Sequence, residues 1–173
     1  MAMYLDLMDP VIPGESKSPY GNWNNKIEIQ HMGYDISSTT SMEAGTGLSS
    51  SGSRVGALSV TKVMDKSTYK LWYHLCSGTP ISKMAIRVVR PGAAKNGQYE
   101  GLYEAETYQL GNVIVSSYST SGSAGMGGLP TEGWSFSFTQ ITETYQEIDE
   151  KGNLKPPASF SYDFATATEA AGN

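Results

Sequence analysis

The chain has 173 residues and a net charge of −5, a length that suits one domain with a substantial core and is short for two. Seventeen Asp and Glu residues outnumber twelve scattered Lys and Arg residues, so the basic stripe that nucleic-acid binding needs is missing. The single cysteine, Cys76, cannot close an intrachain disulfide, and no long apolar run or N-terminal leader pattern stands out. We therefore expect folding in a reducing cytoplasm, no nucleic-acid partner and no membrane insertion.

Alternation of apolar and polar side chains marks the first strands. Residues 3–7 and 27–32 carry apolar side chains at every second position, which is typical of half-buried strands. The phase slips at Gly33, because Tyr34 and Ile36 continue on the other set of positions, and a glycine bulge or bend is expected there. Further strands are expected at residues 54–63, 81–90, 98–110, 112–118, 133–145 and 159–166.

Two long segments rich in Ser, Thr and Gly interrupt this pattern, residues 37–53 and residues 119–131. A loop of more than about a dozen residues without structure of its own is usually functional or mobile. We therefore expect both segments to be loops that serve contacts rather than the core.

One segment predicts a helix at mid-chain. Ser67, after Asp65, is placed to cap a helix over about residues 67–77, with Gly78 to end it. Strands joined by short turns, with a single helix, indicate a mainly β fold. We expect an antiparallel β-barrel or sandwich of about eight strands with one short α-helix, forming a single domain over residues 1–166 that is followed by a flexible tail over residues 167–173.

Groups for metal or acid–base chemistry are scarce. His31 and His74 are far apart in the sequence, and no HExxH or CxxC spacing provides metal ligands. A structural role is favoured for both histidines, and Cys76 is interpreted as a small buried side chain rather than a nucleophile. No serine stands in a Gly-x-Ser-x-Gly elbow. The residues therefore indicate no metal site and no catalytic constellation, and we expect no cofactor.

Two side-chain patterns have both a structural and a functional interpretation. Glu100, Glu104 and Glu106 share one face of a predicted strand, and solvation or pairing with Lys or Arg from another strand is favoured over a glycosidase pair. Aromatic residues alternate over residues 134–138. They would stack sugars if exposed, but a core face is favoured. Open sheet edges that pair with a second copy would make this an assembly protein.

Short motifs spread in order from about residue 3 to residue 164 carry a resemblance to one family. The pieces are Gly14-Glu15-Ser16-Lys17, Ser41-Met42-Glu43-Ala44-Gly45, the run from Leu58 to Thr68, Leu71, Cys76-Ser77-Gly78, the run from Val113 to Ser119, Thr131-Glu132, Phe136-Ser137-Phe138 and Tyr145. In this order they resemble the haemolysin-coregulated protein (Hcp) family, the tube protein of the bacterial type VI secretion system. Residues 19–25 and 45–53 depart from the family's usual composition.

The resemblance implies a small β-barrel with one helix, which assembles as homohexameric rings that stack into the inner tube of a contractile injection machine. The tube is expelled with the spike, and some members of the family carry small effector proteins inside the ring. The resemblance also implies that the protein is not an enzyme. The implied partners are other copies of the chain, a spike protein of the VgrG type, the contractile sheath, the baseplate and secreted effectors. The implied location is the bacterial cytoplasm during assembly and then the extracellular medium or a target cell, without a signal peptide.

Two sets of residues follow as hypotheses for assembly. The segment 37–53 is expected to contact the next ring, with Ser41, Met42, Glu43, Gly45, Gly47 and Ser51 as the ring-stacking residues. The Gly/Ser segment 119–128 is expected to border the lumen or the rim of the ring, where small polar residues resist nonspecific adhesion. Its candidate residues are Ser119, Ser121, Gly122 and Ser123.

Three other functions remain open at this point. The abundance of Tyr and Trp leaves a carbohydrate-binding β-sandwich module as the main alternative, which predicts a monomer with exposed aromatic side chains. A hydrolase that uses a serine with His31 or His74 is a further possibility. A phage tail-tube protein is close in class to the secretion tube.

Overall fold

The computed structural model describes residues 1–18, 21–43, 47–92, 94–95, 98–99, 102–123, 128–150 and 153–168. Within them lie fourteen strands, one α-helix and one 3-10 turn. Their bounds are β1 (Ala2–Asp9), β2 (Val11–Ile12), η1 (Gly21–Trp23), β3 (Ile27–Ile29), β4 (His31–Gly33), β5 (Ile36–Glu43), β6 (Gly47–Val55), β7 (Leu58–Val63), α1 (Ser67–Ser77), β8 (Ile81–Pro91), β9 (Ala94–Lys95), β10 (Gln98–Tyr99), β11 (Leu102–Ser121), β12 (Thr131–Ser137), β13 (Gln140–Tyr145) and β14 (Ala158–Asp163).

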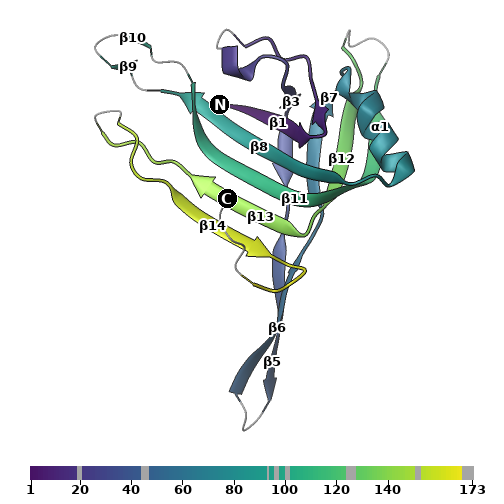
Figure 1. Cartoon of the computed structure of the whole chain (residues 1–173), viewed down its shortest axis with the longest axis vertical. Helices are drawn as coiled ribbons and strands as arrows, with labels where there is room; N and C mark the ends of the chain where they lie inside the picture. The colour runs from purple at the N-terminus through teal and green to yellow at the C-terminus, as the bar shows by residue number, and fades with distance from the viewer. Residues whose placement is uncertain are drawn as a thin grey trace.

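Ten strands form one antiparallel sheet that bends around the core (Figure 1). Its main order is β2-β1-β8-β11-β12-β7-β4. In addition, β13 pairs with β11, β14 pairs with the other edge of β13, and β3 pairs with β1. The mainly β, antiparallel fold with one helix is confirmed. The described residues contain more than the expected number of about eight strands, since some predicted strands are divided and β2, β5, most of β6 and β9 were not expected.

The longest strand, β11, joins the two halves of the sheet. Its first part pairs with β8 and β13, and its last part pairs with β12. We expected a break between residues 110 and 112, but the chain continues as strand there with Asn112 at φ 52°. Asn112 Nδ2 donates to Thr139 Oγ1 at 3.3 Å. The local left-handed conformation therefore bends the strand without ending it.

The core lies on one face of this sheet, where side chains from eight strands and α1 meet. Alternate residues of β1 and β12 supply it, as the period of two predicts, and Trp134 and Phe136 are at most 1% exposed. The aromatic stripe of residues 134–138 is thus a core face, as favoured. Tyr4 points to the opposite face of the sheet, where its ring stacks on Trp23 at 5.4 Å.

Helix α1 has the predicted bounds, but its N-terminus differs from the prediction. The residue at the cap position is Lys66, and Ser67 is the first helical residue. Asp65 takes the capping role, because its Oδ1 accepts the Ser67 backbone N–H at 3.0 Å. Gly78 ends the helix at φ 64°, as predicted. In the described part of the chain, no helix has the length and apolar character of a transmembrane span.

A buried polar network attaches α1 to the sheet. Glu132 of β12 and Lys62 of β7 are both fully buried, and Lys62 Nζ lies 2.9 Å from Glu132 Oε2. The same oxygen accepts hydrogen bonds from Thr68 Oγ1 at 2.9 Å and from Trp134 Nε1 at 3.2 Å. Lys62 Nζ also donates to Asp65 Oδ1 at 2.8 Å. The network therefore satisfies both buried charges and holds the first turn of α1 in place.

Candidate assembly surfaces

Strands β5 and β6 form a two-stranded hairpin that projects from the body of the molecule (Figure 1). We call this hairpin the arm. Ile36 pairs with Val55 at its base, and serine hydroxyls join the two strands along its length: Ser38 Oγ lies 2.5 Å from Ser50 Oγ, and Ser41 Oγ lies 2.8 Å from Ser49 Oγ. The loop expected over residues 37–53 is therefore wrong. Cross-strand hydroxyl pairs stabilise a hairpin that has no apolar alternation.

The far end of the arm carries an apolar pair. Met42 and Leu48 are directly opposite each other in the register and are 81% and 72% exposed. Of the other residues expected there, Glu43 pairs with Gly47 through the backbone register, and Ser51 lies in β6. Gly45 lies outside the described residues. The segment is thus a polar shaft with an apolar tip, and this tip is the feature suited to contact another surface.

The segment expected at the lumen or rim begins as strand. Ser119 and Ser121 belong to the end of β11, opposite Gly133 and Thr131 of β12, and Gly122 and Ser123 follow them. Residues 124–127 lie outside the described residues. The expectation of a loop over residues 119–131 is therefore wrong for its first three residues and its last one. This end of β11 and the tip of the arm lie at opposite ends of the long axis of the molecule (Figure 1).

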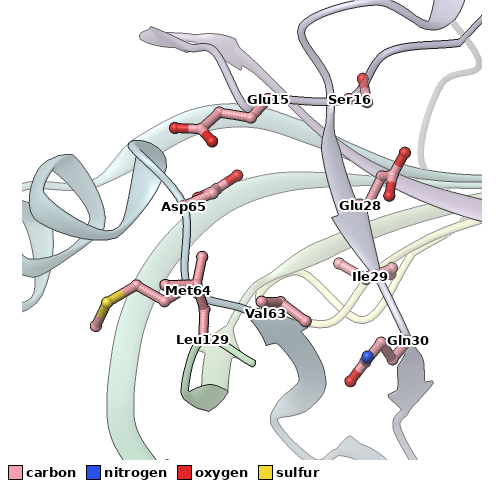
Figure 2. A pocket seen from close by; sticks show the side chains of 9 residues that line it. All are labelled: Glu15, Ser16, Glu28, Ile29, Gln30, Val63, Met64, Asp65 and Leu129. Carbon is pink, nitrogen blue, oxygen red and sulfur yellow. The ribbon is translucent and has the colours of Figure 1, made fainter. Parts of the chain in front are cut away.

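A pocket of about 310 Å³ lies beside the N-terminus of α1, and Figure 2 shows the residues that line it. Three carboxylates come from separate elements: Glu15 from the segment after β2, Glu28 from β3 and Asp65 from the turn before α1. Glu15 Oε1 accepts the backbone N–H of Lys66 at 3.0 Å. Apolar side chains, among them Leu129, complete the wall. This acidic pocket was not predicted, although Glu15 and Asp65 both belong to the motifs of the resemblance.

A second hollow lies between α1 and the β1–β2 turn. It has a volume of about 300 Å³ and is lined by Pro10, Val11, Ile12, Tyr69, Lys70, Tyr73 and His74. Three of its apolar or aromatic side chains are strongly exposed: Val11 at 70%, Tyr69 at 66% and Tyr73 at 65%. We call it the α1 groove. Sequence reasoning missed it, because Val11 belongs to a strand of two residues and the exposed face of the helix was not considered.

The candidate catalytic residues are separated in the fold. His31 is an exposed residue of β4, whereas His74 is buried in α1 with Nδ1 2.9 Å from the carbonyl oxygen of Thr79. Cys76 is exposed, so the prediction that it is buried is wrong. It lies near the C-terminus of α1, on a helix face turned away from the core. Among the described residues, no group of three or more His, Cys, Asp or Glu side chains is placed to hold a metal ion.

The glutamates of β11 are divided by a bulge. The register shifts between Glu104 and Glu106, and Glu100 lies outside the described residues. Glu104 Oε2 accepts from Arg87 Nη1 at 2.7 Å, and Arg87 Nε lies 3.4 Å from Asp6 Oδ2. The favoured interpretation, a carboxylate paired with a cation of another strand, is confirmed for Glu104.

Two tyrosines lie near the other glutamates, at the margin of the core. Tyr34 OH donates to Glu143 Oε2 at 2.9 Å, and the rings of Tyr34 and Tyr108 meet edge to face at 5.9 Å. Burial, with the Glu143 carboxylate beside it, raises the pKa of Tyr34 to about 12. Burial and the neighbouring Glu106 also raise the pKa of Tyr108 well above its ordinary value. Both phenols therefore remain protonated donors at neutral pH.

Comparison with known proteins gives a consistent result. The profile of the family described as "Type VI secretion system effector, Hcp" matches residues 4–145. A structure described as that of a type six secretion system protein superposes with a TM-score of 0.83 and 24% identity, covering 98% of this chain and 99% of the other. Hcp1 from Salmonella typhimurium gives 0.72 and 22%, covering 98% of each chain. A type VI secretion system effector from Yersinia pestis gives 0.64 and 21%, covering 93% and 98%. No curated protein sequence matches the chain.

Proposed function

The chain belongs to the Hcp family of type VI secretion system effectors, and from that premise we propose that it is a structural component of the inner tube of such a system. In this proposal the chain forms hexameric rings that stack, are expelled with the spike and carry effector proteins in the lumen. The observation that carries the proposal is the family match over residues 4–145.

The features of the arm favour a role in contacts between stacked rings. Met42 and Leu48 expose most of their apolar surface at the end of a hairpin whose other side chains are largely Ser and Thr. Burying a Met or Leu side chain is worth about 1.5–3 kcal/mol before the costs of association. Because six arms in one ring would bind at the same time, contacts that are weak individually would together hold two rings stably. We assign Ser41, Met42, Glu43, Gly45, Gly47 and Ser51 to this contact.

Sideways contacts within a ring need a different surface, and the edge of the sheet offers one. Strand β14 pairs with β13 on one side, and Asp163 forms an additional bridge with Thr168. Phe160 on this strand is 53% exposed and stacks on Tyr162 at 6.2 Å. An exposed strand edge with aromatic side chains is suited to a neighbouring copy. We place a subunit contact of the ring at this edge.

The end of β11 is the proposed border of the lumen or rim. Ser119, Ser121, Gly122 and Ser123 offer small, exposed polar groups there. Such a surface has little apolar area to retain a passing protein. This property suits a channel through which effectors move.

The remaining partners and the location follow from the same proposal. The rings would meet a VgrG-type spike protein, the contractile sheath and the baseplate, and would leave the bacterial cytoplasm for the medium or a target cell without a signal peptide. We also propose that residues 1–166 form one domain. Of the tail proposed as flexible, residues 169–173 lie outside the described residues, and Thr168 bridges back to Asp163.

The three tryptophans give no support to the carbohydrate-binding alternative. Trp23 and Trp134 are 6% and 1% exposed, and Trp72 is half-buried with its ring against Tyr118 at 5.3 Å. None of these indole rings forms the open platform on which a sugar stacks. We therefore propose no glycan-binding function.

The test is the absolute mass of the purified protein, measured by light scattering after size exclusion, with negative-stain images of the same fraction. A mass close to six chains and ring-shaped particles are expected. A monomer that persists at high protein concentration would contradict the proposal and would require screens for other activities.

A further inference from the structure

The proposed stacking role of the arm requires a surface that accepts its apolar tip, and the α1 groove has the character of such a surface. The α1 groove is lined mainly by apolar and aromatic side chains, and Val11, Tyr69 and Tyr73 are each at least 65% exposed. Exposed apolar side chains gathered around a hollow mark an interaction site more strongly than the same side chains scattered over a surface. The groove is open, so that a hairpin end can enter it from the side.

The tip has the shape that such a groove accepts. Met42 and Leu48 are cross-strand partners in the register, so both side chains leave the same face of the hairpin. Directly opposite side chains on a hairpin stand about 4.5–5.5 Å apart at their Cβ atoms. They form one compact apolar unit at the end of a narrow shaft.

Charge distinguishes the α1 groove from the acidic pocket beside the N-terminus of α1. Residues 37–53 contain one acidic residue, Glu43, and no Lys or Arg, while Arg54 lies at the base of the arm opposite Ser37. The α1 groove contains Lys70 and no carboxylate, whereas the acidic pocket contains Glu15, Glu28 and Asp65. A negatively charged tip is attracted to the first hollow and repelled by the second.

The positions of the tip and the groove fit a contact between successive copies. The tip lies at one end of the long axis of the molecule, and α1 lies toward the other end (Figure 1). A projection at one end and its receptor toward the other end make a heterologous, head-to-tail contact. Repetition of such a contact along the axis produces an open stack.

We propose that the apolar tip formed by Met42 and Leu48 of one copy sits in the α1 groove of a copy in the next ring, between Val11, Tyr69 and Tyr73. Lys70 then lies near the acidic end of the arm. This inference rests on the proposed function of the arm in stacking and adds to it the receiving surface.

Disulfide trapping tests the contact even when the stack is short-lived. All variants carry Cys76→Ser, because Cys76 is exposed and would react. Purified Leu48→Cys protein is mixed with purified Tyr69→Cys protein under mild oxidation. Two cysteines join when their Cα atoms approach to about 5.5–6 Å. We expect the yield of the mixed disulfide dimer to be at least about tenfold higher than for the control pair, because only cysteines that are held close together join efficiently.

The matched control pairs Leu48→Cys with Leu154→Cys, an apolar residue that is 58% exposed elsewhere on the molecule. Equal yields for the two pairs would overturn the groove assignment. If the yield with Tyr69→Cys is no higher than with Leu154→Cys while Met42→Ser with Leu48→Ser still shortens the stacks, the groove is rejected and the stacking role of the arm remains. If that double variant leaves the stacks unchanged, the stacking role fails as well.

A charge exchange provides a second readout that does not depend on cysteine chemistry. Lys70→Glu is expected to reduce the population of stacked rings at least about threefold at low salt, and Glu43→Lys in the same chain is expected to restore it. Lys155→Glu, which changes an exposed lysine far from the groove in the sequence, is the control. Stacking that is unaffected by Lys70→Glu, or not restored by the second change, would contradict the charge argument for the groove.

Discussion

Lys62 and Glu132 form an ion pair that is closed off from solvent: Nζ and Oε2 are 2.9 Å apart, and neither side chain is exposed. The two residues are partners in the register of β7 and β12. Thr68 of α1 contacts both, because its Oγ1 donates to Glu132 and lies 3.1 Å from Lys62 Nζ. The pair therefore joins β12 to β7 and α1, which lie about 60 residues before it in the sequence.

Removing one member of this pair is expected to be severe. Lys62→Met leaves the Glu132 carboxylate buried without its cation, which costs about 3–5 kcal/mol of unfolding free energy. The measurement is a urea denaturation curve of the variant and of the unchanged protein under identical conditions. The exposed pair Lys155–Glu147 is the matched control, since Lys155→Met should leave the urea midpoint nearly unchanged.

The double variant Lys62→Met with Glu132→Leu distinguishes two contributions to the free energy of unfolding: the cost of a buried charge without a partner and the net stabilisation by the ion pair. Because both charges are gone, it is expected to recover a large part of the loss. A double variant as unstable as Lys62→Met alone would show that the hydrogen bonds to Glu132, from Thr68 and Trp134, carry the stability instead.

Gly14 stands where two segments touch. A Cβ at this position would lie 2.2 Å from the carbonyl oxygen of Lys26 and 2.5 Å from the backbone nitrogen of Ile27. Gly14→Ala must therefore separate the segment after β2 from β3, and it is expected to cost about 1–3 kcal/mol in thermal or urea unfolding. Gly128→Ala is the control, because its Cβ would meet open space. Equal stabilities for the two variants would contradict the close approach.

The tip of the arm is expected to affect assembly and not folding. Met42→Ser with Leu48→Ser removes exposed apolar surface, so the stability of the isolated fold should change by less than about 0.5 kcal/mol. Stacks of rings should become shorter in sedimentation velocity and negative-stain images, while single rings remain. Deletion of residues 45–51 should give the same result, and failure of that variant to form rings would contradict the assignment.

The phenol of Tyr34 predicts a loss of stability in alkali. Its pKa is about 12 in the folded chain, against about 10 in an unfolded one. Because the folded pKa is raised, the contribution of Tyr34 is complete below about pH 10 and disappears as the pH rises toward about 12. Urea midpoints measured across this window should fall less steeply in Tyr34→Phe. Identical slopes would show that the phenol titrates as it does in an unfolded chain.

Local signals in the sequence were sufficient for the elements with strong boundaries. The helix over residues 67–77 was predictable because Gly78 ends it, and the alternating strands β1 and β12 because their apolar faces are buried. Strand β11 was not predicted as one element, since Gly111 and Asn112 together resemble a turn. Whether such a pair turns or bends the chain is decided by the neighbouring strands, which pair with β11 on both sides of it.

The assembly surfaces were predictable only in part. The sequence marked residues 37–53 as unusual, but a strand of serines lacks the apolar alternation from which strands are recognised. The α1 groove depends on Val11 and Tyr73, which meet only when β2 is placed beside α1. Local sequence patterns do not predict contacts between residues that are distant in the sequence. The buried pair Lys62–Glu132 was missed for the same reason.

The place where the arm joins the body determines how the protein withstands force. Strand β5 follows shortly after β4, and β6 leads shortly into β7, so the arm extends the direction of the β4–β7 pair (Figure 1). A pull on the arm is therefore transmitted along β7, whose six residues are paired with β12. Hydrogen bonds loaded in this direction are sheared together rather than peeled apart one by one. In the proposed tube, a pull on the arm would thus separate neighbouring copies before it unravels a subunit.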